Sequence, residues 1–174
     1  MTDLRDLIGE IPDFPQPGIL FRDLLPILAD PSAVSTVIDR ITTFAAPLEP
    51  DIVVGAEARG FLFGPLVAHA LGVGFAPVRK PGKLPGPAHA ERYALEYGEG
   101  TLELAETAVR PGQRALIHDD LLATGGTAAA SISLVRRAGA VPVGCCFVAE
   151  LRGLAGRLLL GDLPVCSLVE YDGA

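Results

Sequence analysis

The sequence predicts an α/β fold in which a largely parallel central sheet is flanked by helices. Short apolar runs, typical of buried strands, alternate along the chain with segments whose apolar residues recur at helical spacing. Such alternation is typical of βαβ units, in which consecutive strands lie parallel. A chain of 174 residues can form a substantial core, and its sequence contains no internal repeat. We therefore expect a single domain over residues 1–174.

The elements are expected in a regular order along the chain. Asp30 or Ser32 can cap a helix whose apolar residues share one face. Residues 11–31, which precede it, are dense in proline and too apolar for a linker, so we expect an ordered, irregular segment, for example a strap packed across the core. We expect helices over residues 2–10, 32–44, 61–71, 128–137 and 152–160, and strands over residues 51–55, 73–78, 115–117, 141–149 and 165–170.

Composition narrows the class of protein. The chain is 49% hydrophobic and 20% charged, as a folded globular protein is, and its net charge of −7 argues against nucleic-acid binding. No apolar run approaches the roughly 20 residues that a membrane span needs, and the first ten residues carry no basic signal. Cys145, Cys146 and Cys166 lack metal-ligand spacing and are expected to be reduced thiols in the core. We expect a cytoplasmic protein without nucleic-acid or membrane partners.

The segment with the clearest chemistry follows the strand expected at residues 115–117. Asp119 and Asp120 stand where that strand should end, and the turn at residues 123–127 leads into a helix. Glycines let backbone N–H groups approach a ligand closely, and a helix N-terminus adds partial positive charge, so the turn suits a phosphate. The two carboxylates would repel a phosphate but can accept hydrogen bonds from the diol of a ribose. The pattern indicates a ribose 5-phosphate pocket; the alternative is an ordinary strand, turn and helix with an aspartate cap.

Cations occur at two other predicted turns. Residues 55–60 connect a strand to a helix and place Arg59 at the helix start, which makes a second anion site plausible. Alternatively, Arg59 is a surface residue paired with Glu57. A stiff loop after the next strand carries a cluster of cations that can offset negative charge on a ligand, or can simply be solvated; its members are Arg79, Lys80 and Lys83.

Residues 91–104 alternate between apolar and polar side chains and include two tyrosines. This pattern predicts a β-hairpin with its turn near Glu99 and Gly100. A hairpin inserted between two βα units is a natural lid over a site.

Residues 118–127 resemble the phosphoribosyl-pyrophosphate (PRPP) signature of the type I phosphoribosyltransferases. The run Asp-Asp-Leu-Leu-Ala-Thr-Gly-Gly-Thr resembles, in particular, the form found in the members that act on adenine. The resemblance extends from Ile11 to Tyr171, with the motifs in family order. His118 departs from the pattern, since the family usually has an aliphatic residue there, and its role stays open.

The resemblance implies two covers for the site, an N-terminal hood and a flexible β-hairpin lid. Residues 11–31 resemble the short hood over the base, in which Phe21 would stack on the purine while Arg22 and the backbone at Leu20 read its edge. Leu151 would pack on the other face of the base. Residues 79–104 resemble the lid region, in which Glu96 would donate a proton to the purine and Tyr97 would close over PRPP; Glu96 could instead be a solvated strand residue.

The resemblance also implies an activity, a cofactor and an assembly. The reaction would transfer the phosphoribosyl group from PRPP to adenine, giving AMP and pyrophosphate, with Mg²⁺ held mainly through PRPP oxygens and water. A homodimer and a cis peptide at Glu57–Ala58 are expected on the same ground. The catalytic residues would be Glu96, Asp119, Asp120 and Arg59, and the PRPP contacts Arg59, Arg79, Lys80, Lys83, Tyr97, Asp119, Asp120, Ala123, Thr124, Gly125, Gly126 and Thr127.

Three other functions stay open at this stage. A phosphoribosyltransferase for another base shares the PRPP run but should lack the hood. A regulator could bind PRPP without catalysis, although such proteins normally add a DNA-binding region, and this chain is short and acidic. The third is a nucleotide-binding module without phosphoribosyl chemistry, which would fail to bind PRPP with Mg²⁺.

Overall fold

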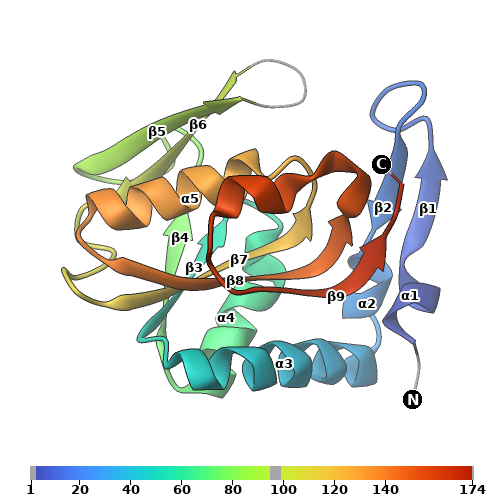
Figure 1. Ribbon diagram of the computed structural model, residues 1–174, viewed down its shortest axis with the longest axis horizontal. Helices are drawn as coiled ribbons and strands as arrows, with labels where there is room; N and C mark the ends of the chain where they lie inside the picture. Colours follow the sequence, from blue (N-terminus) through green and yellow to red (C-terminus); the bar gives the residue numbers. More distant parts are fainter. Residues whose placement is uncertain (1–2, 95–98, 174) are drawn as a thin grey trace.

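The computed structural model describes residues 3–94 and 99–173. Its centre is a five-stranded sheet of order β4-β3-β7-β8-β9 in which all neighbours are parallel (Figure 1). The five strands are β3 (Ile52–Ala56), β4 (Gly74–Val78), β7 (Arg114–Leu122), β8 (Val141–Leu151) and β9 (Val165–Tyr171). The main helices are α3 (Pro31–Ala45), α4 (Gly60–Leu71) and α5 (Gly126–Arg137). This architecture confirms the predicted parallel α/β fold.

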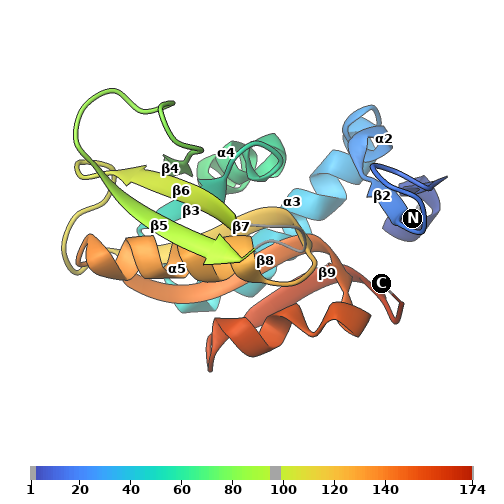
Figure 2. The ribbon, with the colours of Figure 1, turned by 90° about the horizontal axis from the view of Figure 1, so that it is seen from above.

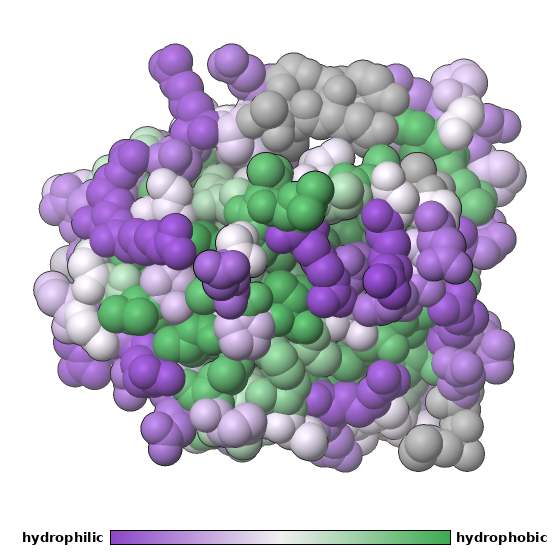
Figure 3. All heavy atoms as spheres, in the orientation of Figure 1, coloured by the Kyte–Doolittle hydropathy of each residue, from purple (hydrophilic) through white to green (hydrophobic). Residues whose placement is uncertain are grey.

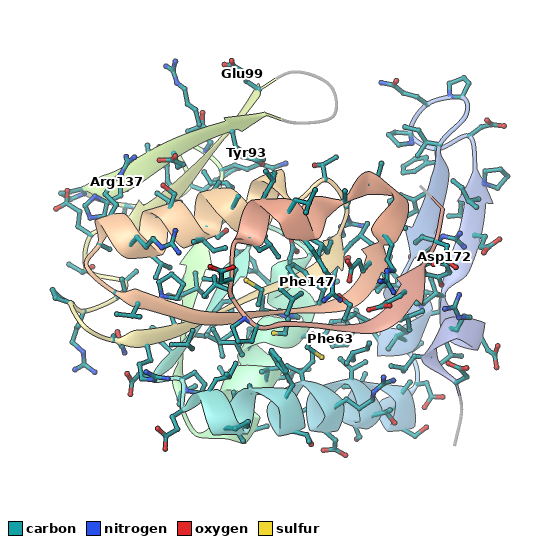
Figure 4. All side chains as sticks on the ribbon, viewed as in Figure 1. Phe63, Tyr93, Glu99, Arg137, Phe147 and Asp172 are labelled. Atoms are coloured by element: carbon teal, nitrogen blue, oxygen red, sulfur yellow. The ribbon has the colours of Figure 1, made fainter. Side chains whose placement is uncertain are left out.

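Helices cover the sheet on both faces, with α3 and α4 on one side and α5 on the other (Figures 1 and 2). Successive residues of a strand point to opposite faces, which explains the continuous apolar runs. In β7, Leu116 belongs to the cluster around α3 and α4, whereas Ile117 belongs to the cluster around α5. Phe63 and Phe147 lie on opposite sides of the sheet in the same way (Figure 4).

The order of the strands places a ligand site between β3 and β7. From β3 the chain passes through α4 to β4 on one side, and it later returns through β7 on the other side of β3. Ligands of open α/β sheets bind where the strand order reverses, outside the carboxyl ends of the strands. Here that position brings together the end of β7, the start of α4 and the start of α5.

Two antiparallel hairpins stand at opposite ends of the sheet (Figure 1). One pairs β1 (Gly9–Pro12) with β2 (Leu20–Asp23) and is followed by α2 (Leu25–Leu28). The segment expected to be irregular is therefore partly regular. The other hairpin pairs β5 (Ala88–Ala94) with β6 (Glu99–Ala105).

The second hairpin corrects the predicted turn. Gly100 pairs with Tyr93 and Glu99 pairs with Ala94, so both residues belong to β6 and not to the turn. Glu96 and Tyr97, with the rest of the connection, lie outside the described residues. The base of this hairpin is fastened to the end of α5, where Arg137 donates to the Ala90 carbonyl at 2.6 Å and pairs with Glu91 (Figure 4).

Other boundaries also differ from the prediction. Strand β7 continues through both aspartates, because its pairing with β8 extends to Leu122. Helix α1 covers only Leu4–Leu7, and residues 152–160 form two short 3₁₀ segments, η2 (Arg152–Leu154) and η3 (Gly156–Leu160). A further 3₁₀ turn, η1 (Ala46–Leu48), follows α3.

The remaining expectations concern the thiols and the membrane. Cys145 and Cys146 are buried free thiols, and Cys166 is a partly buried one. Among the described residues, no helix has the length and apolarity to cross a membrane. Hydrophilic and apolar side chains alternate over the face seen in Figure 3, and Leu158 and Leu159 of η3 are exposed.

Candidate functional site

Two adjacent carboxylates occupy the carboxyl end of β7. Asp120 is only 1% exposed, and neither oxygen of its carboxylate has a hydrogen-bond partner among the described residues. The Arg59 Nε atom lies 3.3 Å from its Oδ2 atom. Asp119 is partly buried, and its Oδ1 accepts the Asp120 backbone N–H at 2.9 Å. Buried carboxylate oxygens without donors are costly, so this pair is prepared for a ligand that brings donors or positive charge.

Burial changes the acidity of this pair. Burial and the charge of Asp120 raise the pKa of Asp119 well above its usual value. Burial also raises the pKa of Asp120, and the charge of Arg59 opposes both shifts. The pair therefore takes up a proton more readily than exposed carboxylates do, and a perturbed acidic pair in a cleft is a functional-site candidate.

A cavity of about 210 Å³ adjoins the aspartates at the N-terminus of α5. Gly125 precedes the helix with a φ of 84°, a backbone conformation that favours glycine. The cavity thus combines a helix N-terminus, small residues and hydroxyl groups beside one carboxylate and one guanidinium, an arrangement that suits an anion. Its lining consists of Arg59, Asp119, Leu121, Leu122, Ala123, Thr124, Gly125, Gly126, Thr127 and Ala128.

The start of α4 is held tightly against the end of β7. A Cβ on Gly60 would lie 2.9 Å from the His118 carbonyl oxygen and 3.3 Å from Asp119 Oδ1, so only glycine fits without a shift. This close packing places Arg59, the residue before Gly60, next to Asp120. The alternative in which Arg59 pairs with Glu57 is therefore wrong. The Glu57–Ala58 peptide is cis, as expected.

Glu57 instead organises the cationic loop after β4. Its Oε2 accepts a hydrogen bond from Arg79 Nε at 3.1 Å and one from the Lys80 backbone N–H at 2.8 Å. These bonds, the Arg79 bond foremost, lower the pKa of Glu57, and the charge of Lys83 adds to the effect. The loop is thereby tied to the turn that carries Arg59. Glu57 was not predicted to have this role, because the two segments lie far apart in the sequence.

The hairpin of β1 and β2 reaches the same site. The Arg59 guanidinium carbon lies 5.6 Å from the centre of the Phe21 ring, and Phe14 packs edge-to-face on Phe21 with ring centres 5.1 Å apart. Leu20 is partly buried next to Phe21, and Leu151, at the end of β8, is 8% exposed.

Arg22 is engaged in the scaffold. Its guanidinium carbon lies 3.9 Å from the centre of the Tyr171 ring, and the group also pairs with Glu10. The Arg22 side chain is thus held between the hairpin and β9.

His118 is fully buried beside the aspartates. Its Nδ1 atom lies 3.1 Å from the Cys146 carbonyl oxygen, whereas its Nε2 atom has no partner among the described residues. Burial lowers the pKa of His118 from 6.5 to about 4. The ring is therefore neutral at pH 7, with Nδ1 donating to the carbonyl.

This burial has a measurable consequence for stability. His118 takes up a proton near pH 6.5 in the unfolded chain but only near pH 4 in the folded chain. The free energy of unfolding therefore falls as the pH drops through this window, by about 3 kcal/mol in all. We expect His118→Leu to remove this part of the pH dependence in urea unfolding. Exposed His69→Leu is the matched control. Equal slopes for wild type and His118→Leu between pH 6.5 and 4 would contradict the assignment.

Most of the predicted site residues meet at the carboxyl edge of the sheet. Arg59, Phe21, the two aspartates and residues 123–127 lie together there, with Leu151 at the end of the next strand. Gly156, which packs against the turn of residues 123–125, was not predicted, because a single glycine after Ala155 carries no local signal of such a contact.

Comparison with known proteins places this site in a family. Residues 34–159 match the phosphoribosyl transferase domain family. An adenine phosphoribosyltransferase of Synechococcus sp. is 53% identical over 170 residues, which are 98% of this chain and 99% of that protein. One of Solibacter usitatus is 52% identical over 172 residues, 99% of each chain.

Solved structures agree in fold over nearly the whole chain. The adenine phosphoribosyltransferase of Thermoanaerobacter pseudethanolicus superposes with a TM-score of 0.94 at 45% identity, covering 97% of this chain and 98% of that one. The Saccharomyces cerevisiae enzyme, complexed with an imino-altritol bisphosphate and adenine, gives a TM-score of 0.90 at 43% identity, covering 95% of this chain and 96% of that one.

Proposed function

The chain belongs to the adenine phosphoribosyltransferases, and from this premise we propose how its own residues carry out the transfer. The reaction moves the 5-phosphoribosyl group of PRPP to adenine, giving AMP and pyrophosphate, a step of purine salvage. One observation supports the proposed roles above all. Among the described residues, no donor reaches the buried Asp120 carboxylate, and the neighbouring Asp119 lines an anion-suited cavity at the start of α5.

The ribose 5-phosphate is held by two chemically different parts of one segment. The backbone N–H groups of residues 123–127 and the hydroxyls of Thr124 and Thr127 bind the 5-phosphate. Asp119 and Asp120 accept hydrogen bonds from the ribose hydroxyls, which supply the donors that the Asp120 carboxylate lacks among the described residues. Anchoring the sugar at both ends fixes its anomeric carbon relative to the base.

Charge development explains why the carboxylates lie beside the sugar. Displacement at the anomeric carbon passes through an oxocarbenium-like state, with positive charge on the ribose and negative charge growing on the diphosphate. The buried carboxylates stabilise the positive charge, and their effect is strong because little water screens it. Arg59 faces the negative charge, and it is the cation nearest to the pair.

The loop of Arg79, Lys80 and Lys83 supplies further positive charge to the diphosphate. Glu57 already binds Arg79. This bond orders the loop, but it also occupies part of the Arg79 guanidinium. Bound Mg²⁺ would neutralise charge on the leaving diphosphate. We propose that PRPP oxygens and water hold most of its coordination sites, and the hard carboxylate oxygens of Asp119 and Asp120 suit the ion or its water.

Adenine lies between the hood, residues 11–31, and Leu151. Phe21 provides a ring face on which the base stacks, and Arg59 lies next to this ring. The base and the diphosphate are therefore bound on opposite sides of the ribose. Because Tyr171 and Glu10 engage the Arg22 side chain, we assign to Arg22 and Leu20 recognition of the base edge through the backbone.

We propose residues 79–104 as the lid region of the site, as the family resemblance implies. Glu96 and Tyr97 are proposed there as proton donor and cover for PRPP, on the family resemblance alone. The rest of the hairpin is anchored to α5 through Arg137, the same helix whose N-terminus faces the phosphate.

The assembly and location are also proposals. We propose one domain over residues 1–174, assembled as a homodimer, which the mass in solution at micromolar concentration tests. Three free thiols are consistent with a reducing cytoplasm.

The activity is tested by pyrophosphate release from PRPP and Mg²⁺, with adenine present or omitted. We expect release that depends on adenine and is not supported by hypoxanthine, because the site was assigned to adenine by hood and family. Pyrophosphate release with hypoxanthine but not with adenine would contradict the assignment to adenine. PRPP binding in calorimetry without release from any purine would identify a regulator that kept the pocket.

A further inference from the structure

The phosphate-binding turn rests on a second segment of backbone. Gly156, the first residue of η3, packs directly against residues 123–125. A Cβ on Gly156 would overlap the Ala123 carbonyl oxygen and lie 2.9 Å from the Gly125 nitrogen and 3.0 Å from the Thr124 carbonyl carbon. A Cβ on Gly125 would in turn overlap the Gly156 carbonyl oxygen. Two backbones therefore touch here, and neither position leaves room for a side chain.

This contact lies outside the phosphate cavity. Residues 121–128 line the cavity, and Gly156 does not. Gly156 contacts the turn at a point outside the cavity. It can therefore affect the position of the turn, but it does not contact the ligand. The φ of Gly156 lies outside the left-handed region, so its lack of a side chain is explained by this contact alone.

Arg157, the next residue, fastens the supporting segment to the sheet. Its Nε atom donates to both carboxylate oxygens of Glu150, at 2.7 and 2.9 Å, and its Nη2 atom donates to Glu150 Oε2 at 2.6 Å. Glu150 is 3% exposed near the end of β8. Nη2 also reaches Glu170 of β9 at 3.0 Å, and Glu170 pairs with Arg152 of η2 at 2.7 Å. Bidentate pairing of a buried carboxylate fixes geometry closely.

We propose that Gly156 and Arg157 are positioning residues for the 5-phosphate of PRPP, acting through the turn of residues 123–127. The inference rests on the proposed role of that turn. Backbone N–H groups bind a phosphate only when they converge on it, so a small displacement of the turn weakens every bond at once. The contacts that link β8 to Arg157 and Gly156 to the turn fix the position of the turn before substrate binds.

The first test is Gly156→Ala. We expect the KM for PRPP to rise about tenfold or more, since a misplacement of about 1 Å can cost about a hundredfold, while the KM for adenine stays within about twofold. Gly74→Ala is the matched control, because a Cβ there meets nothing closer than 3.9 Å. Calorimetry with ribose 5-phosphate should show the same loss of affinity. An unchanged KM for PRPP in folded Gly156→Ala would overturn the proposal.

A second pair of variants keeps the proposal testable if Gly156→Ala does not fold. Arg157→Met leaves the Glu150 charge buried and unpaired, whereas the double variant with Glu150→Gln removes both charges. We expect the double variant to recover thermal stability but to retain a raised KM for PRPP, because the fastening is still missing. Recovery of both stability and KM would show that Arg157 has a merely structural role and would overturn its assignment.

Failure of the inference is distinguishable from failure of the proposed function. Thr127→Val removes a hydroxyl from the turn itself and should raise the KM for PRPP. If it does so and Gly156→Ala does not, the turn binds the phosphate without this support. If Thr127→Val has no effect either, the phosphate site itself is misassigned and the inference falls with it.

Discussion

Replacing Asp119 and Asp120 together with asparagine is expected to lower kcat/KM by about a thousandfold while making the folded protein more stable at pH 7. The loss of activity follows from the loss of negative charge beside the ribose. Asparagine can still hydrogen-bond a hydroxyl, but it cannot stabilise an oxocarbenium-like sugar. The measurement is pyrophosphate release under steady-state conditions.

The gain in stability follows from the cost of the buried charges. Both folded-state pKa values are raised, so the folded chain holds protons that the unfolded chain has released. This part of the stability is present below the usual pKa of 3.8 and is lost as the pH rises through the folded-state values. Asparagine does not ionise, so the variant avoids the loss.

The two outcomes together are diagnostic, because a structural role predicts the opposite sign for stability. Urea unfolding at pH 7 gives the comparison, and Asp39→Asn, on the exposed face of α3, is the matched control that should change neither quantity. A double variant that is less stable than wild type, or that retains activity within about tenfold, would contradict the account.

Replacing Arg59 with glutamine is expected to have the second largest effect, a decrease in kcat/KM of about a hundredfold. Arg59 is the cation nearest to Asp120 and lies against Phe21, between the proposed places of the diphosphate and the base. Removing it takes away charge stabilisation of the leaving group. Exposed Arg110→Gln is the matched control and should be silent.

The same variant should change the pH dependence of activity. The charge of Arg59 lowers the pKa of both aspartates, so its removal raises their pKa further. The activity depends on the ionised aspartates, so on acidification Arg59→Gln should lose activity at a higher pH than the wild type does. Arg59→Lys restores the charge without the planar fork and should restore the acid limb more than the rate. An acid limb that does not move in Arg59→Gln would show that the three groups are not coupled.

The sequence predicted those features that local pattern determines. The parallel sheet followed from apolar runs such as the one around Leu116 and Ile117, whose side chains pack on opposite faces. The acidic pair followed by a glycine turn predicted the centre of the candidate site, and the turn into a helix predicted an anion site at Arg59. The place of Phe21, in strand β2, was expected from the family resemblance alone.

Features set by distant contacts could not be predicted. The end of β7 depends on its register with β8, and the hairpin register that places Gly100 opposite Tyr93 depends on cross-strand packing. Glu57 binds Arg79 in place of Arg59 because β3 and β4 are neighbours in the sheet. Gly156 has a role only because another turn of backbone packs against it.

A crystal structure with bound AMP tests the central claim most directly. The account predicts the 5-phosphate within hydrogen-bond distance of the backbone N–H groups of residues 123–127, with the ribose hydroxyls donating to the carboxylates of Asp119 and Asp120. A phosphate bound elsewhere, or ribose hydroxyls that do not reach the two aspartates, would contradict it.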